Sequence, residues 1–152
     1  MSSGCQVYVL LDTMPPNDFE YAVWNGPDGQ PIAYPEVAAT LRARLAGHMA
    51  ALDAPRLVVA THVLACEEQI QRRAHPGWRF VNAFMGSLAL GRLVRSDPRV
   101  VLHVAGHTHH GSDHRIGGLR AVVSPLGYRG EWKGGTPAEA VRRALTVLEL
   151  PG

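Results

Sequence analysis

The fold of this chain is constrained most by two short apolar runs without polar alternation, Arg56–Thr61 (RLVVAT) and Arg99–Ala105 (RVVLHVA). Runs of this kind predict strands that are buried on both faces, as in a parallel sheet. Between them, Ser87–Arg95 has apolar residues at a helical period, and Ser87 is a good N-cap. Because strands alternate with helices, the sequence predicts a layered α/β fold.

The rest of the chain fits the same fold class. Thr136-Pro137-Ala138-Glu139 has the pattern of a capping box with proline at the first helical position, so a short helix begins there. Proline and glycine interrupt two long stretches and predict irregular chain. These criteria predict strands over 6–11 and 119–124, a helix over 36–52, and irregular chain over 12–35 and 63–86. Residues 144–150 could continue the last helix or form a strand, and Thr146 and Val147 favour the strand.

Length and composition indicate one soluble globular domain over residues 1–152, with 46% apolar and 18% charged residues. The net charge of +2 and the scattered arginines argue against a nucleic-acid partner. The two cysteines form no C-x-x-C pair, and no signal peptide or membrane-spanning run is present in the sequence. We therefore expect a cytoplasmic protein without disulfides and without a membrane partner.

Histidines follow two of the predicted strands at the points where these strands end. His62 follows the first strand, and His107 and His109 follow the second, after Gly106. If the two strands are neighbours in the sheet, their ends lie about 5 Å apart, and Gly106 is expected to let the backbone bend. Imidazole is a common metal ligand, so the pattern predicts a metal site, with a solvated histidine-rich loop as the alternative.

Other candidate groups have weaker support in the sequence. His110, Asp113 and His114 are expected to be bystanders in a polar loop, and His103 is expected to be a histidine of the sheet interior. No G-x-S-x-G or phosphate-loop motif is present in the sequence. Cys66 has no activating base nearby in the sequence, which favours a buried thiol.

Two motifs resemble those of the calcineurin-like metallophosphoesterases. They are Ala60-Thr61-His62 after one buried strand and Gly106-His107-Thr108-His109 after the next. Three further stretches are similar to one bacterial branch of that family. These stretches are Glu68-Gln69, Trp78–Ser87 (WRFVNAFMGS) and Ser124–Trp132 (SPLGYRGEW), so the resemblance extends from about Val37 onward.

The resemblance implies a site with two adjacent divalent ions, of manganese, iron, zinc or magnesium, that clamp a phosphoester substrate and activate water. It assigns His62 and His107 to one ion and His109 to the other. It also assigns Ser124–Trp132 to a loop near the substrate pocket. Three residues are candidates to face that pocket: Asn82, Tyr128 and Arg129.

The chain departs from the family pattern in its first part. The D-x-H, G-D-x-x-D and G-N-H motifs of a complete member are absent from the sequence, and Asp12 is followed two residues later by Met14 rather than histidine. We therefore expect a partial α/β sandwich of the metallophosphoesterase type, with the N-terminal half missing and weak metal binding by the isolated chain. The expected partner is a separate N-terminal half or a second copy. The alternative is a non-catalytic remnant that keeps the histidines.

Overall fold

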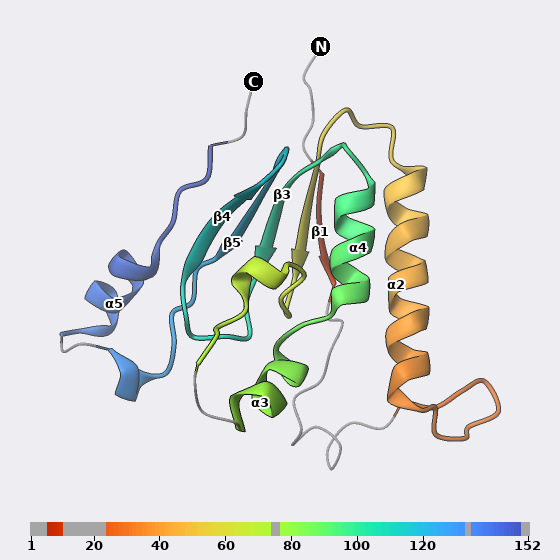
Figure 1. The fold of residues 1–152 in the computed structure, drawn as a ribbon, viewed down its shortest axis with the longest axis horizontal. Helices are drawn as coiled ribbons and strands as arrows, with labels where there is room; N and C mark the ends of the chain where they lie inside the picture. The colour runs from red at the N-terminus through yellow and green to blue at the C-terminus, as the bar shows by residue number, and fades with distance from the viewer. Residues whose placement is uncertain (1–5, 11–23, 74–76, 133–134, 150–152) are drawn as a thin grey trace.

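One five-stranded sheet, in the order β1-β2-β3-β5-β4, organises the computed structural model (Figure 1). The structure describes residues 6–10, 24–73, 77–132 and 135–149. The neighbours β1-β2-β3-β5 run parallel, and β4 pairs antiparallel with β5. The strands are β1 Gln6–Leu10, β2 Leu57–Thr61, β3 Val100–Ala105, β4 Ser112–Ile116 and β5 Leu119–Val123. The predicted α/β class is confirmed.

Two helices, α2 (Tyr34–Ala51) and α4 (Leu88–Ser96), stand side by side over one face of the sheet (Figure 1). Ser87 is the N-cap of α4, as predicted, and its hydroxyl accepts a hydrogen bond from the backbone N–H of Leu90. A shorter helix, α3 (Gly77–Met85), lies beyond the carboxyl ends of the strands. The remaining helical elements are η1 Glu67–Gln69, η2 Arg129–Glu131 and α5 Pro137–Ala144.

Both faces of the central strands are buried, as the absence of polar alternation predicts. The larger apolar cluster joins α2, α4 and one face of the sheet, and it contains Leu45, Val59 and Leu90. On the other face, a smaller cluster of Val58, Leu102 and Val122 is packed against by Leu148 from the segment after α5. The central strands are therefore packed on both faces, which fixes the points at which their loops begin.

Three sequence-based predictions were wrong. The stretch 63–86 is not wholly irregular, because it contains η1 and α3, and α3 has apolar residues at helical spacing. Residues 145–149 form no strand; the hydroxyl of Ser124 binds the carbonyl of Ala144 and the hydroxyl of Thr146, and Leu148 packs on the sheet. β4 was missed because its sequence, SDHRI, is polar, as suits an edge strand.

The other predicted boundaries agree with the structure to within about two residues, a normal margin for helix and strand ends. Thr136 and Glu139 form the predicted capping box of α5. The predicted loop over 12–35 is described only from residue 24, and Asp12 and Met14 lie outside the described residues. No described helix has the length and apolarity needed to cross a membrane.

Candidate metal centre

The candidate site lies at the carboxyl edge of the sheet, where β2 and β3 end side by side. Thr61 is in register with Ala105, and the next residues are His62 and Gly106. The backbone N–H of Gly106 donates to the carbonyl of His62 over 3.0 Å, which extends the pairing by one step. The expectation that the two strands are neighbours is therefore confirmed.

The sharp turn after β3 occurs at His107 rather than at Gly106. His107 has φ of 62° and is the one non-glycine residue with positive φ among the described residues. A Cβ on Gly106 would meet His62 only at an ordinary 3.5 Å, so the expected special role of that glycine is not supported. Backbone strain of this kind at a non-glycine residue costs free energy and is concentrated at functional sites.

The turn brings His107 against His62. Nδ1 of His107 lies 3.1 Å from Nε2 of His62, and the ring centroids are 4.9 Å apart in an edge-to-face arrangement. Two zinc–nitrogen bonds of about 2.1 Å each permit nitrogen separations up to about 4.2 Å. The donor chemistry and the spacing of the two imidazoles therefore fit a shared divalent ion.

The segment that follows His62 is unusually buried for a loop. Residues 63–66 are all 3% exposed or less. Leu64 pairs with Gly86, and α4 approaches so closely that a Cβ on Gly91 would overlap the carbonyl oxygen of Ala65. These contacts fix the backbone that carries His62, because any movement of it would disturb the packed core.

A buried histidine lies directly behind the end of β2. The hydroxyl of Thr61 donates to the carbonyl of Val63 over 2.6 Å, so it accepts from Nε2–H of His103 over 2.9 Å. His103 is fully buried, and its Nδ1 has no hydrogen-bond partner among the described residues. Burial lowers the pKa of His103 to about 4. His103 is thus a neutral histidine of the sheet interior, as expected.

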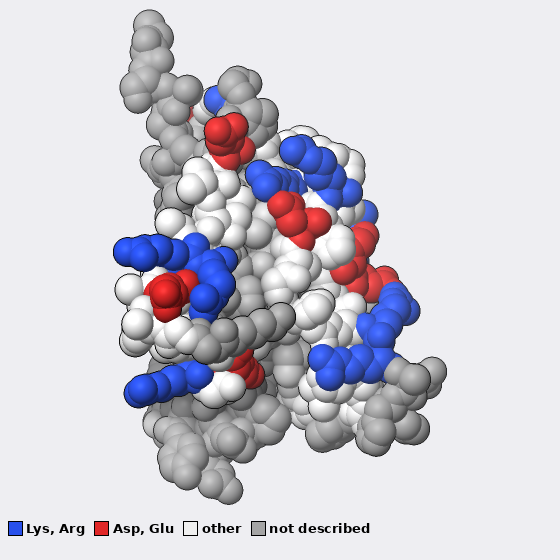
Figure 2. Space-filling model, turned by 90° about the vertical axis from the view of Figure 1, so that its left-hand side faces the viewer, with Lys and Arg blue, Asp and Glu red and all other residues white. Residues whose placement is uncertain are grey.

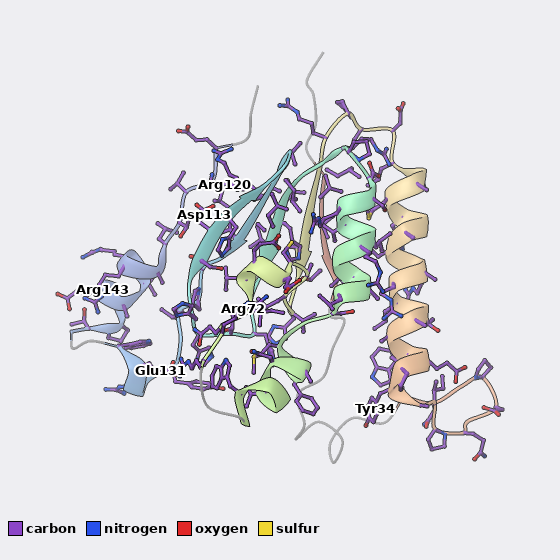
Figure 3. All side chains as sticks on the ribbon, viewed as in Figure 1. Tyr34, Arg72, Asp113, Arg120, Glu131 and Arg143 are labelled. Atoms are coloured by element: carbon purple, nitrogen blue, oxygen red, sulfur yellow. The ribbon has the colours of Figure 1, made fainter. Side chains whose placement is uncertain are left out.

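His109 does not join the His62–His107 pair but contacts Glu131 instead. Its Nδ1 lies 2.7 Å from Oε2 of Glu131, and its ring packs edge-to-face on Tyr128 at 4.4 Å. The hydrogen bond from His109, and then the one from the backbone N–H of Tyr128, hold the pKa of the Glu131 carboxyl below its usual range. Figure 3 shows Glu131 at the end of the sheet where α3 also lies.

One pocket of about 630 Å³ brings the histidines and most of the predicted pocket residues together. Asn82 and Tyr128 line this pocket, whereas Arg129 is exposed and does not line it. The Asn82 amide donates to the carbonyl of Gln71 over 2.9 Å, so it also supports the pocket wall. The lining residues are His62, Leu64, Gln71, Arg73, Trp78, Asn82, Met85, His107, Thr108, His109, His110, Tyr128 and Glu131.

Sequence reasoning missed two charged residues of this pocket, Arg73 and Glu131. The Arg73 guanidinium lies 4.1 Å from the ring centre of Trp78, and its Nε donates to the side-chain oxygen of Gln71 over 3.0 Å. No motif marks Arg73 in the sequence. Glu131 could have been found from its position within SPLGYRGEW, the stretch that resembles the bacterial branch.

The remaining candidates have structural explanations. Asp113 pairs with Arg120 over 2.7 Å on the β4–β5 hairpin, where Figure 3 shows both residues. His114 lies on β4 outside this pocket, whereas His110 lines it. Burial raises the pKa of the Cys66 thiol to about 11, so this thiol is a poor nucleophile.

Neither of the two candidate serines forms a hydrolase triad with described residues. Ser124 binds Ala144 and Thr146, and Ser87 caps α4. Among the described residues, no three His, Cys, Asp or Glu side chains converge closely enough to hold one ion. The described part of the chain therefore supplies an imidazole pair, with His109 and Glu131 further along the same pocket.

Basic and acidic side chains are interleaved on the face of the molecule shown in Figure 2. The described residues on this face form no uninterrupted basic stripe of the kind that follows a nucleic-acid backbone.

The fold and the histidines define an α/β protein with a polar site at the carboxyl ends of its parallel strands. The crystal structure of phosphopantetheinyl hydrolase (PptH) from Mycobacterium tuberculosis is similar, with a TM-score of 0.53 and 22% sequence identity. The match covers 76% of this chain and 39% of that chain, so this chain spans less than half of that enzyme's length. No protein-family model and no curated protein matches the chain. At 22% identity, this structural similarity supports the fold alone.

Proposed function

We propose that this chain supplies the histidine ligands of a metal-dependent phosphoester hydrolase of the calcineurin-like type. The observation that carries the proposal is the His62–His107 pair, with nitrogens 3.1 Å apart in a pocket that His109 also lines. The Thr61-His62 and Gly106–His109 motifs support it independently. The similar fold of an enzyme described as a phosphopantetheinyl hydrolase agrees with it.

In this proposal His62 and His107 hold one divalent ion, and His109 contributes to a second. Manganese, iron, zinc and magnesium are the candidates, and among these imidazole suits iron and zinc best. Such ions, when bound, polarise a phosphoryl group and activate water. The protein contributes the fixed positions of its imidazoles, which follow from the buried loop after His62 and the strained turn at His107.

Substrate binding is assigned to the polar and aromatic groups around the histidines. Arg73 offers a guanidinium that suits a phosphate group, and its stacking on Trp78 limits the freedom that binding would otherwise remove. Tyr128 is 72% exposed as a residue and lines the pocket, so its ring is available to the organic part of a phosphoester. Asn82 contributes to the wall through its bond to Gln71.

The site needs further ligands before it can hold two ions firmly. Two dications require carboxylate charge, and the described residues offer no group of three acidic, cysteine or histidine ligands. We propose that the missing ligands come from a separate chain that carries the D-x-H and G-N-H motifs, or from a second copy. The competing proposal is a non-catalytic remnant, which the same observation favours.

Metal content and hydrolysis distinguish the two proposals. The purified chain is loaded with Mn²⁺, desalted and analysed for bound metal, alone and after mixing with a polypeptide that carries the missing motifs. The enzyme proposal expects about one weakly held ion for the chain alone. It expects two ions after mixing, together with hydrolysis of bis(p-nitrophenyl) phosphate that His107→Ala abolishes. If the mixture binds metal but does not hydrolyse the substrate, the chain is a non-catalytic remnant. If no Mn²⁺ is retained under either condition, the proposed metal site is refuted.

A further inference from the structure

Glu131 belongs to a local arrangement that occurs twice in this chain. In both places a glycine with positive φ, Gly127 or Gly135, precedes a glutamate by four residues. The glutamate folds back, and its Oε2 accepts the backbone N–H of the residue after the glycine. Glu131 accepts from Tyr128 over 2.7 Å, and Glu139 accepts from Thr136 over 2.6 Å.

The backbone conformation at both positions favours glycine, and a side chain at either position would also displace the glutamate carboxylate. A Cβ on Gly127 would lie 2.6 Å from Oε2 of Glu131, and a Cβ on Gly135 would overlap Oε2 of Glu139 in the same way. Their φ angles of 71° and 94° are also rare for residues with side chains. Each arrangement is therefore a compact cap that a glutamate completes.

Only one of the two glutamates reaches a histidine in the described structure. Oε2 of Glu131 also contacts Nδ1 of His109 over 2.7 Å, whereas Oε2 of Glu139 accepts hydrogen bonds from the backbone and the hydroxyl of Thr136. Within the same loop, Nε1–H of Trp132 donates to the carbonyl of Leu126 over 3.2 Å. Capping alone explains Glu139, but it does not explain the second contact of Glu131.

We propose that Glu131 is a positioning residue that holds His109 as the Nδ1–H tautomer and directs Nε2 to a divalent metal ion. An ionised carboxylate only accepts hydrogen bonds, so the proton of a neutral His109 lies on Nδ1. Nε2 then keeps its lone pair, and the ring is fixed between the carboxylate and Tyr128. Metal-binding histidines are commonly oriented by such a carboxylate. The metal part of this inference rests on the proposed function; the tautomer does not.

Nitrogen NMR of the metal-free, ¹⁵N-labelled chain tests the tautomer. At a pH where His109 is neutral, its ring is expected to show protonated Nδ1, and an unconstrained imidazole favours the opposite form. Glu131→Ala should move His109 towards Nε2–H, and Glu131→Gln should retain Nδ1–H because its amide oxygen also accepts. Glu139→Ala removes the matched cap and should leave the His109 signals unchanged.

Mn²⁺ affinity provides the second readout. Glu131→Ala should weaken binding about 10- to 100-fold where His109 contributes a ligand, and Glu139→Ala should not change it.

An Nε2–H ring in the wild-type chain overturns the proposal even if Glu131→Ala fails to fold. Equal tautomer shifts in Glu131→Ala and Glu139→Ala overturn it too. If the wild type binds no Mn²⁺, the proposed function and the metal half of this inference fail, while the NMR result still decides whether Glu131 orients His109.

Discussion

Nε2 of His62 lies 3.1 Å from Nδ1 of His107, although 45 positions separate the two residues in the sequence. Their meeting follows from the parallel pairing of β2 and β3, which end together at Thr61 and Ala105. His62 is the next residue after β2, and His107 follows β3 after Gly106, so both lie at the same edge of the sheet. At this edge the backbone of His107 adopts a strained, positive φ that directs its ring to His62.

We predict that His62→Ala and His107→Ala each weaken Mn²⁺ binding more than about tenfold, and that the double variant adds little. The reason is that a single remaining imidazole cannot replace a pair that shares one ion. Counting free Mn²⁺ by EPR measures this effect. His114→Ala is the control, because His114 does not line the pocket. Independent, additive losses would show that the two histidines do not share an ion.

A second prediction concerns the buried His103 and pH. Burial lowers the pKa of His103 to about 4, whereas in the unfolded chain its pKa stays near the ordinary histidine value of 6.5. The unfolded chain therefore binds a proton more readily, and the free energy of unfolding falls as the pH drops from about 6.5 to about 4. The expected loss from this residue is about 3 kcal/mol. Urea unfolding across that range measures it.

His103→Leu is the variant that isolates this contribution. Leucine cannot take up a proton, and the hydroxyl of Thr61 keeps its bond to the carbonyl of Val63. The difference in unfolding free energy between wild type and variant should change with pH in the direction given above. A difference that is independent of pH would show that His103 is not the group responsible.

The arginine at the start of β3 stabilises the carboxyl end of α2. Arg99 donates to the carbonyls of Leu52 and Met49 over 2.7 and 2.8 Å, and it pairs with Asp97 over 2.7 Å. Lysine cannot make this fork of bonds. We predict that Arg99→Lys lowers the unfolding free energy by about 1–3 kcal/mol. Arg95→Lys is the matched control, since its 3.9 Å surface pair with Glu68 is expected to contribute almost nothing.

The packing of α4 on the loop after β2 can be tested with one methyl group. Alanine normally stabilises a helix relative to glycine by about 0.5–1 kcal/mol. Gly91→Ala is predicted to destabilise the fold instead, by about 1–3 kcal/mol or more, because its Cβ would overlap Ala65. Gly47→Ala in α2 meets nothing within 4 Å and should show the ordinary gain. Thermal unfolding of both variants compares them; equal behaviour would contradict the close approach.

The sequence predicted the sheet and the histidines better than it predicted the chain around them. β2 and β3 were identifiable because strands buried on both faces need continuous apolar residues, and the histidines follow directly. β4 could not be identified in the same way, because an edge strand that contains Asp113 and His114 has the composition of a polar loop. Glu131 lies within the SPLGYRGEW stretch but was not singled out, because its contact with His109 depends on how the chain turns at Gly127.

The last prediction uses that turn to displace Glu131 without altering its carboxylate. Gly127→Ala puts a Cβ 2.6 Å from Oε2 of Glu131 at a φ of 71°, so either the turn or the carboxylate must move. We expect loss of the Nδ1–H tautomer of His109 in nitrogen NMR and Mn²⁺ binding weakened about tenfold. Gly130→Ala in the same loop meets nothing within 4 Å and is the control that should leave both readouts unchanged. If Gly127→Ala also leaves His109 unchanged, the carboxylate does not depend on this glycine for its position.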